Sequence, residues 1–286
     1  MSHLSGKSIA ILGGSGTLGR ALVKYVFNHK IDLSSILIFS RDEIKQLEMM
    51  EEFPEKSSVE IAYKLGDVRD PERLKEVING FDYVVHAAAI KHVVMAEKNP
   101  EECHKTNVLG TQNVIEACLK SSIAKAILIS TDKAVDPIGV YGKSKKEAER
   151  LWQKASTNGS THFQAIRLGN IIGARGSVFE VFQRQRKTGI IKVTHPEATR
   201  FCISQEKAAE FIFHSIASVS NKILIPKMES FKVIELAKQI APECEIEIIG
   251  LRPGDKLHEK LREVNSHDID YKSEKHVFYT GETYDS

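Results

Sequence analysis

The sequence has little of what marks secreted, membrane or metal-binding proteins. Its four cysteines are far apart and lack metal-site spacing, so we expect free thiols in a reducing compartment. No apolar run is long enough for a membrane helix, and the N-terminus has no signal-peptide core. His258-Glu259 is not followed by a second histidine at zinc-protease spacing, and we expect no metal. These absences predict a cytoplasmic protein without a membrane segment.

Charge of one sign is also missing. Forty Lys and Arg residues face 38 Asp and Glu residues, which gives no overall attraction to nucleic acid. There is neither an internal repeat nor a low-complexity linker. A chain of 286 residues with 42% hydrophobic content is long enough for one large domain, or for a domain with a smaller appendage that packs against it.

The first part of the chain alternates short apolar runs with amphipathic segments. This pattern is typical of parallel strands joined by helices, and it predicts a Rossmann-type, doubly wound α/β sheet. The predicted strands are 7–12, 35–39, 59–65, 81–86, 126–129 and 161–168, and the helices between them include 20–29, 99–118 and 145–152.

The alternation loosens after residue 173. We expect a smaller α+β part there, with helices at 177–187, 204–218 and 231–240, strands at 190–193, 223–226, 245–249 and 276–279, and a last helix after the turn at 250–256. The predicted organisation is a dinucleotide-binding domain over 1–173, and a mainly substrate-binding domain over 174–286 that is interleaved with it.

A glycine-rich turn separates the first predicted strand from its helix. Glycines at such a turn let the backbone approach a pyrophosphate, which then lies at the helix N-terminus. The spacing differs from the common Gly-x-Gly-x-x-Gly pattern, and a purely structural turn is the alternative. The candidate cofactor-binding residues here are Gly13, Ser15, Gly16, Thr17, Leu18 and Gly19.

The ends of the next three strands supply further cofactor candidates. Ser40-Arg41 offers a hydroxyl and a cation where an acidic residue would hold a ribose hydroxyl, which favours NADP over NAD. Alternatively, Ser40 caps the next helix and Arg41 is solvated. Asp67, followed by Val68, is placed to accept from an adenine amino group, unless this segment only starts a helix. The small residues Ala87, Ala88 and Ala89 would let a strand end pass close to a ligand, or simply pack.

The stretch 130–145 concentrates acid–base groups. It begins at a strand end with Ser130-Thr131, and continues to Tyr141 and Lys145, which share one helix face at a spacing of four. A lysine ammonium and a nicotinamide cation would lower the pKa of the tyrosine, which could then remove a proton from an alcohol during hydride transfer. Thr131 could donate to the developing carbonyl oxygen. We therefore expect Thr131, Tyr141 and Lys145 to be catalytic, with Tyr141 and Lys145 also contacting the cofactor.

Nearly the whole chain resembles the extended short-chain dehydrogenases/reductases that act on nucleotide sugars. Within that superfamily it is most similar to configuration-inverting UDP-N-acetylglucosamine 4,6-dehydratases. The motifs that carry the resemblance are the glycine turn, Phe39-Ser40-Arg41-Asp42-Glu43, the segments 86–93 and 105–114, the stretch 130–145, Arg167-Leu168-Gly169-Asn170, Arg175-Gly176-Ser177-Val178, Thr199-Arg200-Phe201 and the segment 251–259.

The resemblance implies a redox-neutral dehydration with NADP (or NAD). Tyr141 would remove the proton of the 4-hydroxyl as hydride leaves carbon 4. Lys133 would abstract the proton of carbon 5 and Asp132 would protonate the departing 6-hydroxyl, before carbon 5 is reprotonated from the opposite face. These roles need a neutral amine and a neutral carboxylic acid, and we expect burial to shift both groups that way. Relatives that retain configuration carry a carboxylate in place of Lys133. The alternative for Asp132-Lys133 is a surface ion pair.

The resemblance also implies supporting residues. Asn107 would support the catalytic centre and contact the cofactor, and the candidate sugar and diphosphate contacts are Lys91, Asn170, Val178, Arg200 and Arg252. Each cation could instead be an ordinary surface residue. Asp136 and Gly139 stand where the family often has amides, and Cys202 where it has a bulky aromatic residue, so the identity of the sugar stays open.

Three functions are compatible with these residues. The first is an inverting UDP-N-acetylhexosamine dehydratase that serves surface-polysaccharide or nonulosonic-acid synthesis, in a family where some members also epimerise carbon 3. The second is a nucleotide-sugar 4-epimerase or reductase. The third is a non-catalytic dinucleotide-sensing module, although such a sensor would have no use for Tyr141 and Lys145. By analogy with the fold, we expect a homo-oligomer.

Overall fold

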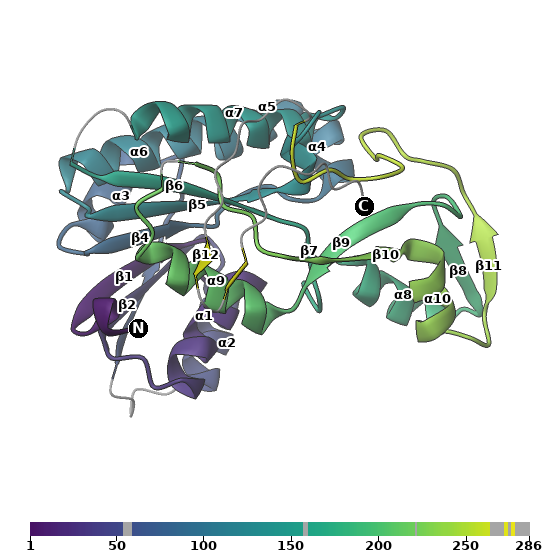
Figure 1. Cartoon of the computed structure of the whole chain (residues 1–286), viewed down its shortest axis with the longest axis horizontal. Coiled ribbons are helices and arrows are strands. Elements are labelled where there is room, and N and C mark those ends of the chain that lie inside the picture. The colour runs from purple at the N-terminus through teal and green to yellow at the C-terminus, as the bar shows by residue number, and fades with distance from the viewer. Residues whose placement is uncertain (54–58, 157–159, 221, 264–271, 274–275, 278–286) are drawn as a thin grey trace.

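A parallel six-stranded sheet forms the centre of the protein. The structure is a computed structural model, and it describes residues 1–53, 59–156, 160–220, 222–263, 272–273 and 276–277. The strand order is β3-β2-β1-β4-β5-β6 (Figure 1). The strands are β1 (Lys7–Leu12), β2 (Leu33–Ser40), β3 (Glu60–Leu65), β4 (Tyr83–His86), β5 (Lys125–Thr131) and β6 (His162–Leu168). This order confirms the predicted doubly wound sheet, whose crevice at the reversal of strand order lies between β1 and β4.

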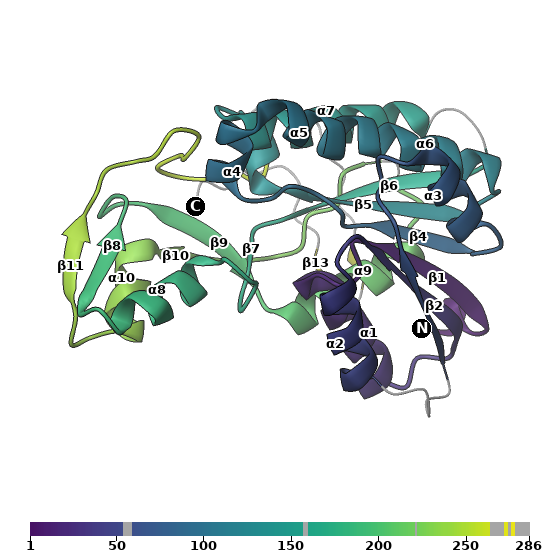
Figure 2. The same ribbon diagram turned by 180° about the vertical axis from the view of Figure 1, so that it is seen from behind.

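Helices cover both faces of the sheet (Figures 1 and 2). One layer contains α1 (Thr17–Asn28), α2 (Glu43–Glu52) and α9 (Gln205–Ile216), and the other contains α3 (Pro71–Ile78), α4 (Val93–Lys98), α5 (Pro100–His104), α6 (Gly110–Lys120) and α7 (Val140–Ala155). Short 3-10 turns lie at Ser2–Leu4 and Asp132–Ala134.

Each face of the sheet has its own hydrophobic core, because alternate residues of a strand point to opposite faces. Ile9 and Ile11 of β1 pack in a cluster that includes the buried side of α1 and α9. Their neighbours Ala10 and Leu12 pack in a second cluster, which contains Trp152 of α7. Burial on both faces explains why these strands are continuous apolar runs rather than alternating ones.

A smaller unit extends from the end of β6 (Figure 1). It contains β7 (Asn170–Ile171), α8 (Val178–Arg186), β8 (Ile190–Val193), β9 (Thr199–Ile203), β10 (Glu229–Lys232), α10 (Val233–Ile240) and β11 (Glu245–Ile248). The strands β10, β9 and β7 form one sheet, and β11 pairs with β8 in another. A separate core that includes Phe182, Ile191 and Leu236 holds this unit together.

Several elements differ from the prediction. The expected helix over 99–118 is interrupted by a π-helical turn at Lys105–Leu109. The expected strand at 223–226 contributes only an isolated bridge, between Ile166 and Leu224. Strands β9 and β10 were not predicted, and Phe231 belongs to β10 rather than to the helix expected from that position.

The predicted last helix is wrong within the described part of the C-terminal segment. Residues 251–263 form turns and bends there. Of the strand expected at 276–279, His276–Val277 forms β13, which pairs with β12 (Lys272–Ser273), and residues 278–279 lie outside the described residues. No described helix is long and apolar enough to cross a membrane.

Candidate active site

The glycine turn between β1 and α1 leaves no room for side chains. At Gly13, where φ is +83°, an added Cβ would lie 2.7 Å from the backbone N of Ala88, and at Gly19 it would lie 2.0 Å from the carbonyl oxygen of Gly14. No side chain caps the first turn of α1, which follows Gly16. The positive end of a 12-residue helix is therefore left to an anionic group, and this fits a dinucleotide pyrophosphate.

Residues next to the turn are tied to other segments. The Ser15 hydroxyl donates to Ser40 Oγ at 2.8 Å. Thr17 Oγ1 accepts from the backbone N–H of Arg175 at 3.3 Å, which brings the smaller unit against the start of α1. Leu18 is buried in the core beneath. The predicted cofactor residues of the turn thus form one compact group.

Arg41, directly after β2, has an exposed side chain. Asp42, and not Ser40, caps α2 by accepting from the backbone N–H of Lys45 at 3.0 Å. Ser40 Oγ instead accepts from Gln46 Nε2 at 2.9 Å. The Arg41 side chain is 55% exposed, which leaves its guanidinium accessible to a phosphate. The capping alternative for Ser40 is therefore wrong.

Asp67 is engaged by arginines. Its carboxylate accepts from the guanidinium of Arg69 at 2.6 Å and lies 3.3 Å from that of Arg41. Burial opposes the charged form, but the hydrogen bonds from Arg69 outweigh it and lower the pKa of Asp67. Asp70 caps α3, so Asp67 is not needed to start that helix. Val68, also predicted to contact the cofactor, is buried beside Gly110.

Tyr141 and Lys145 lie on α7, in its first two turns. Both are buried, at 8% and 4% exposure. The Lys145 ammonium donates to the carbonyl oxygen of Ile129 at 2.7 Å, which fixes the side chain against β5. Burial lowers the pKa of Lys145 to about 8.

The pKa of Tyr141 moves opposite to our expectation. Burial raises it to about 12, although the charge of Lys133 and a hydrogen bond with Thr131 both act to lower it. The stabilising cation that acts on Tyr141 is therefore Lys133 rather than Lys145. Thr131 Oγ1 also donates to Asp132 Oδ1 at 2.8 Å, so this hydroxyl is shared between the phenol and the carboxylate.

Asp132 and Lys133 form a buried ion pair, which contradicts the surface alternative. The Lys133 Nζ lies 3.2 Å from Asp132 Oδ1, and the Asp132 side chain is 1% exposed. A second carboxylate, that of Glu259, lies 3.1 Å from the same nitrogen. Burial alone would lower the pKa of Lys133, but the two carboxylates outweigh it and raise the pKa. The expected shift to a neutral amine is therefore wrong for the protein in this state.

Glu259 was missed as a site residue by sequence reasoning. It stands in the C-terminal motif 251–259, but nothing in that motif alone places its carboxylate against Lys133. The pairing joins positions 126 residues apart, since 259 − 133 = 126. The only available signal was a carboxylate inside a motif otherwise rich in cations.

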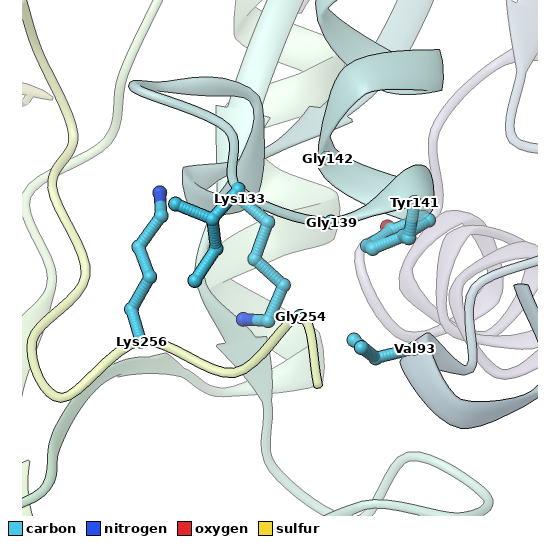
Figure 3. Close-up of a pocket in the computed structure, with 8 residues that line it drawn as sticks. Val93, Lys133, Gly139, Tyr141, Gly142, Gly254 and Lys256 are labelled. Atoms are coloured by element: carbon cyan, nitrogen blue, oxygen red, sulfur yellow. The ribbon is translucent and has the colours of Figure 1, made fainter. Parts of the chain in front are cut away.

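A pocket opens between α7 and the C-terminal segment (Figure 3). Lys133, Tyr141 and Val93 of α4 line it, with Tyr141 and Val93 on the right of the view and Lys133 to their left. Gly254 and Lys256 of the C-terminal segment close it, together with Ile138, Gly139 and Gly142. The pocket is thus lined by both Tyr141 and Lys133.

Gly139 lies where there is no room for a side chain. A Cβ there would lie 2.5 Å from Glu97 Oε1 and 2.8 Å from the Cα of Gly254. Glu97 Oε1 in turn accepts from the backbone N–H of Val140, at the start of α7. The glycine therefore permits a close contact between the C-terminal segment and the start of the helix that carries Tyr141.

Asn107 lies in the π-helical turn, where its side chain is 1% exposed. Its amide accepts from the backbone N of Ile90 at 2.8 Å, and donates to the Ile90 carbonyl at 3.0 Å and to Ser144 Oγ at 2.9 Å. These bonds join the segment after Ala87–Ala89 to α7. Asn107 therefore positions the strand end and the catalytic helix, and its bonds are made within the protein.

The predicted substrate contacts occupy different environments. Arg200 is buried, and its guanidinium donates to the carbonyl oxygens of Thr199, Lys256 and Leu257 at 2.6, 3.0 and 3.1 Å. The Arg252 side chain is 53% exposed, with Nε 2.7 Å from Asp255. Arg200 is thus no ordinary surface cation.

The other three predicted contacts lie on the smaller unit or face it. Lys91 Nζ donates to the carbonyl oxygen of Arg175 at 3.0 Å. Asn170 begins β7 next to β9, and Val178 begins α8. None of the three lines the pocket of Figure 3.

Comparison with known proteins identifies the family of the chain. A family model described as "Polysaccharide biosynthesis protein" matches residues 9–280. The chain belongs to the polysaccharide biosynthesis protein family. It is 40% identical over 279 residues to a UDP-N-acetylglucosamine 4,6-dehydratase (inverting) of Campylobacter jejuni, covering 95% of this chain and 82% of that one.

The chain is also similar to another curated protein and to solved structures. A UDP-glucose 4-epimerase of Rickettsia canadensis is 35% identical over 274 residues, covering 92% of this chain and 79% of that one. The solved structure of Pen from Bacillus thuringiensis has a TM-score of 0.90 at 32% identity, covering 96% and 89%. The dTDP-glucose 4,6-dehydratase DesIV of Streptomyces venezuelae shares the fold, with a TM-score of 0.76 at 16% identity over 87% and 86%. The expected family and fold are therefore both confirmed.

Proposed function

We propose that the protein is an NADP-dependent UDP-N-acetylhexosamine 4,6-dehydratase that inverts carbon 5, with UDP-N-acetylglucosamine as the first candidate substrate. The buried contact between Asp132 and Lys133 beside Tyr141 carries this proposal. The inverting dehydratase of Campylobacter jejuni, at 40% identity, supports it. The products would serve the synthesis of surface polysaccharide or nonulosonic acid.

The cofactor would bind along the glycine turn, with residues 1–173 as its domain and 174–286 mainly as the domain of the substrate. The open N-terminus of α1 would hold the pyrophosphate, and Ser40 with Arg41 would hold the 2′-phosphate of NADP. Asp67 and Val68 would border the adenine. A bound nicotinamide supplies the acceptor and donor of hydride.

The protein's own groups then handle the protons. Tyr141 would take the proton of the 4-hydroxyl, helped by the charge of Lys133 and by the hydrogen bond with Thr131. Lys133 would take the proton of carbon 5, and Asp132 would give a proton to the departing 6-hydroxyl, which leaves as water. Carbon 5 would then take a solvent-derived proton on its opposite face, which inverts it. Asp132 Oδ2 is buried without a hydrogen-bond partner among the described residues, as befits an oxygen that meets a substrate.

This assignment also accounts for the contact between Asp132 and Lys133. Elimination leaves Asp132 as a carboxylate and Lys133 as an ammonium, which is the ion pair present here. Transfer of one proton from Lys133 Nζ to Asp132 Oδ1, over 3.2 Å, would restore the acid and the free amine. The ion pair is therefore the state from which the next cycle is prepared.

The test is a reaction in heavy water with NADP and, separately, UDP-N-acetylglucosamine, UDP-N-acetylgalactosamine and UDP-glucose. We expect loss of one water from a UDP-N-acetylhexosamine and one deuterium at carbon 5 of the product. Intact substrate mass with all three sugars would overturn the proposal.

A 4-epimerase or reductase is the second candidate, favoured by the 35% identity to a UDP-glucose 4-epimerase. An epimerase conserves the mass of the sugar, and a reductase consumes NADPH in proportion to product. The same mass spectra therefore separate the alternatives. A non-catalytic dinucleotide sensor would give no turnover of any kind.

A further inference from the structure

The C-terminal segment 252–261, which we call the latch, is fixed at several points beside Lys133. The guanidinium of Arg200, which lies on β9, donates to the carbonyl oxygens of Lys256 and Leu257 in the latch. Lys256 Nζ donates to the carbonyl oxygen of Val135, and Arg167 donates to that of Leu261 at 3.1 Å. The latch is thus held by buried polar contacts, although it has no helical structure of its own.

Glu259 is the latch residue that faces the chemistry. Its side chain is 1% exposed, and its Oε1 lies 3.1 Å from the Lys133 Nζ. Lys256 Nζ lies 3.6 Å from Oε2 of the same carboxylate. A carboxylate this deeply buried costs several kcal/mol unless cations compensate it, so a purely structural latch would have little use for it.

We propose that Glu259 is a positioning residue of the dehydration, which holds the Lys133 amine in place and stabilises the ammonium that forms when Lys133 takes the carbon-5 proton. This inference rests on the function proposed above. The step breaks the bond between carbon 5 and hydrogen and forms an N–H bond on Lys133, while the electron pair stays on the sugar as an enolate. The negative Glu259 oxygen lies next to the nitrogen that becomes positive.

The charges around Lys133 come from four elements. Asp132 adjoins it in sequence, Glu259 and Lys256 come from the latch, Arg200 from β9, and Tyr141 from α7. Asp132 would enter the elimination as the acid and become a carboxylate only as the 6-hydroxyl departs, and the cations of Lys256 and Arg200 oppose a positive Lys133. Glu259 is therefore the carboxylate that remains available to Lys133 throughout the step.

Glu259→Gln tests this directly, because it keeps the shape and removes the charge. We expect kcat to fall at least tenfold with KM nearly unchanged, and the primary isotope effect with substrate deuterated at carbon 5 to increase, since a weaker base makes that step slower. Glu259→Asp should recover most of the rate. Glu263→Gln is the matched control, because Glu263 lies just beyond the latch and is a 43% exposed partner of Lys146. A purely structural role would leave the isotope effect unchanged, and that result would overturn the proposal.

A second measurement does not depend on turnover. In protein labelled with carbon-13 at the lysine ε position, the Lys133 signal, assigned with Lys133→Gln, reports its protonation. We expect the titration midpoint of Lys133 to fall by at least one pH unit in Glu259→Gln and to stay at the wild-type value in Glu263→Gln. Should Glu259→Gln not fold, Lys133 in Glu259→Asp should keep the wild-type midpoint. Equal midpoints in wild type and Glu259→Gln, or a midpoint in Glu259→Asp below that of Glu263→Gln, would overturn the proposal. If the lysine shift is found but no UDP-sugar is dehydrated, the proposed function fails while the pairing stands.

Discussion

Lys145 and Lys133 are both catalytic candidates, yet their surroundings are opposite. Lys145 lies on a regular helix, donates to a backbone carbonyl, and has its pKa lowered to about 8 by burial. Lys133 lies in a loop between two carboxylates that raise its pKa. Tyr141 and Lys145 form the helical side of the site, which is built by the Rossmann sheet and α7. Asp132 and Lys133 form the loop side, which the latch contacts through Glu259. The comparison teaches that burial and neighbouring carboxylates can shift the pKa values of two amines of one candidate site in opposite directions.

The largest effect is expected on the helical side. Tyr141→Phe keeps the packed ring but removes the proton acceptor, and acid–base groups of this kind contribute roughly 10²–10⁴-fold to rate. We expect dehydration to fall by about 10³-fold, with the melting temperature close to that of the wild type. Stopped assays of product and thermal unfolding would check both. Retention of more than a tenth of the rate would show that another group takes the 4-hydroxyl proton.

Lys133→Gln tests the loop side. The amide keeps most of the volume but cannot act as a base, so incorporation of deuterium at carbon 5 should fall by about 10²-fold or more. Oxidation at carbon 4, followed as transient NADPH absorbance in a single turnover, should persist. Lys133→Glu is a less clean variant, since it would put a third carboxylate beside Asp132 and Glu259.

Arg200 and Arg252 separate support of the latch from contact with substrate. Arg200→Met leaves buried carbonyl oxygens of the latch without their donor, and each such loss costs about 1–3 kcal/mol. We expect a clear fall in the free energy of unfolding, measured with urea. Arg252→Met removes a side chain that is 53% exposed, so stability should hold while KM for the UDP-sugar rises. Equal stability of the two variants would refute the support role of Arg200.

The smallest expected effect is a pH dependence on the helical side. Because burial places the pKa of Lys145 near 8, its ammonium is present below that pH and lost above it. We expect kcat/KM to decline as pH rises through about 8, because the Lys145 cation, which would contact the cofactor, is then lost. The loop side should add no such decline near pH 8, since the pKa of Lys133 is raised. A flat profile between pH 7 and 9 would argue against a role for the Lys145 charge.

The same contrast explains how much could be predicted from the sequence. The helical side could be predicted, because local sequence patterns determine it. Strand β1 begins and ends where the apolar run 7–12 does. The spacing of Tyr141 and Lys145 places both on one face of α7. The π-helical turn around Asn107 could not be predicted from the local sequence. It depends on a hydrogen bond between the Asn107 amide and Ile90, a residue 17 positions away.

The loop side depends on distant contacts. A helix after residue 256 is a reasonable local expectation, but Arg200 and Lys133 instead hold that segment in an irregular course. Strand β9 was not predicted, because Arg200 interrupts its apolar pattern. This arginine is nevertheless buried, and it donates hydrogen bonds to the latch. The role of Glu259 follows only from those contacts.

The configuration of carbon 5 in the product tests the central claim most directly. Wild-type protein would convert UDP-N-acetylglucosamine in heavy water, and proton NMR of the product would give the deuterium content and the stereochemistry at that carbon. The account predicts loss of water, one deuterium at carbon 5, and inverted configuration. Dehydration with retained configuration would contradict it, because Lys133 would then not be the base that sets the outcome.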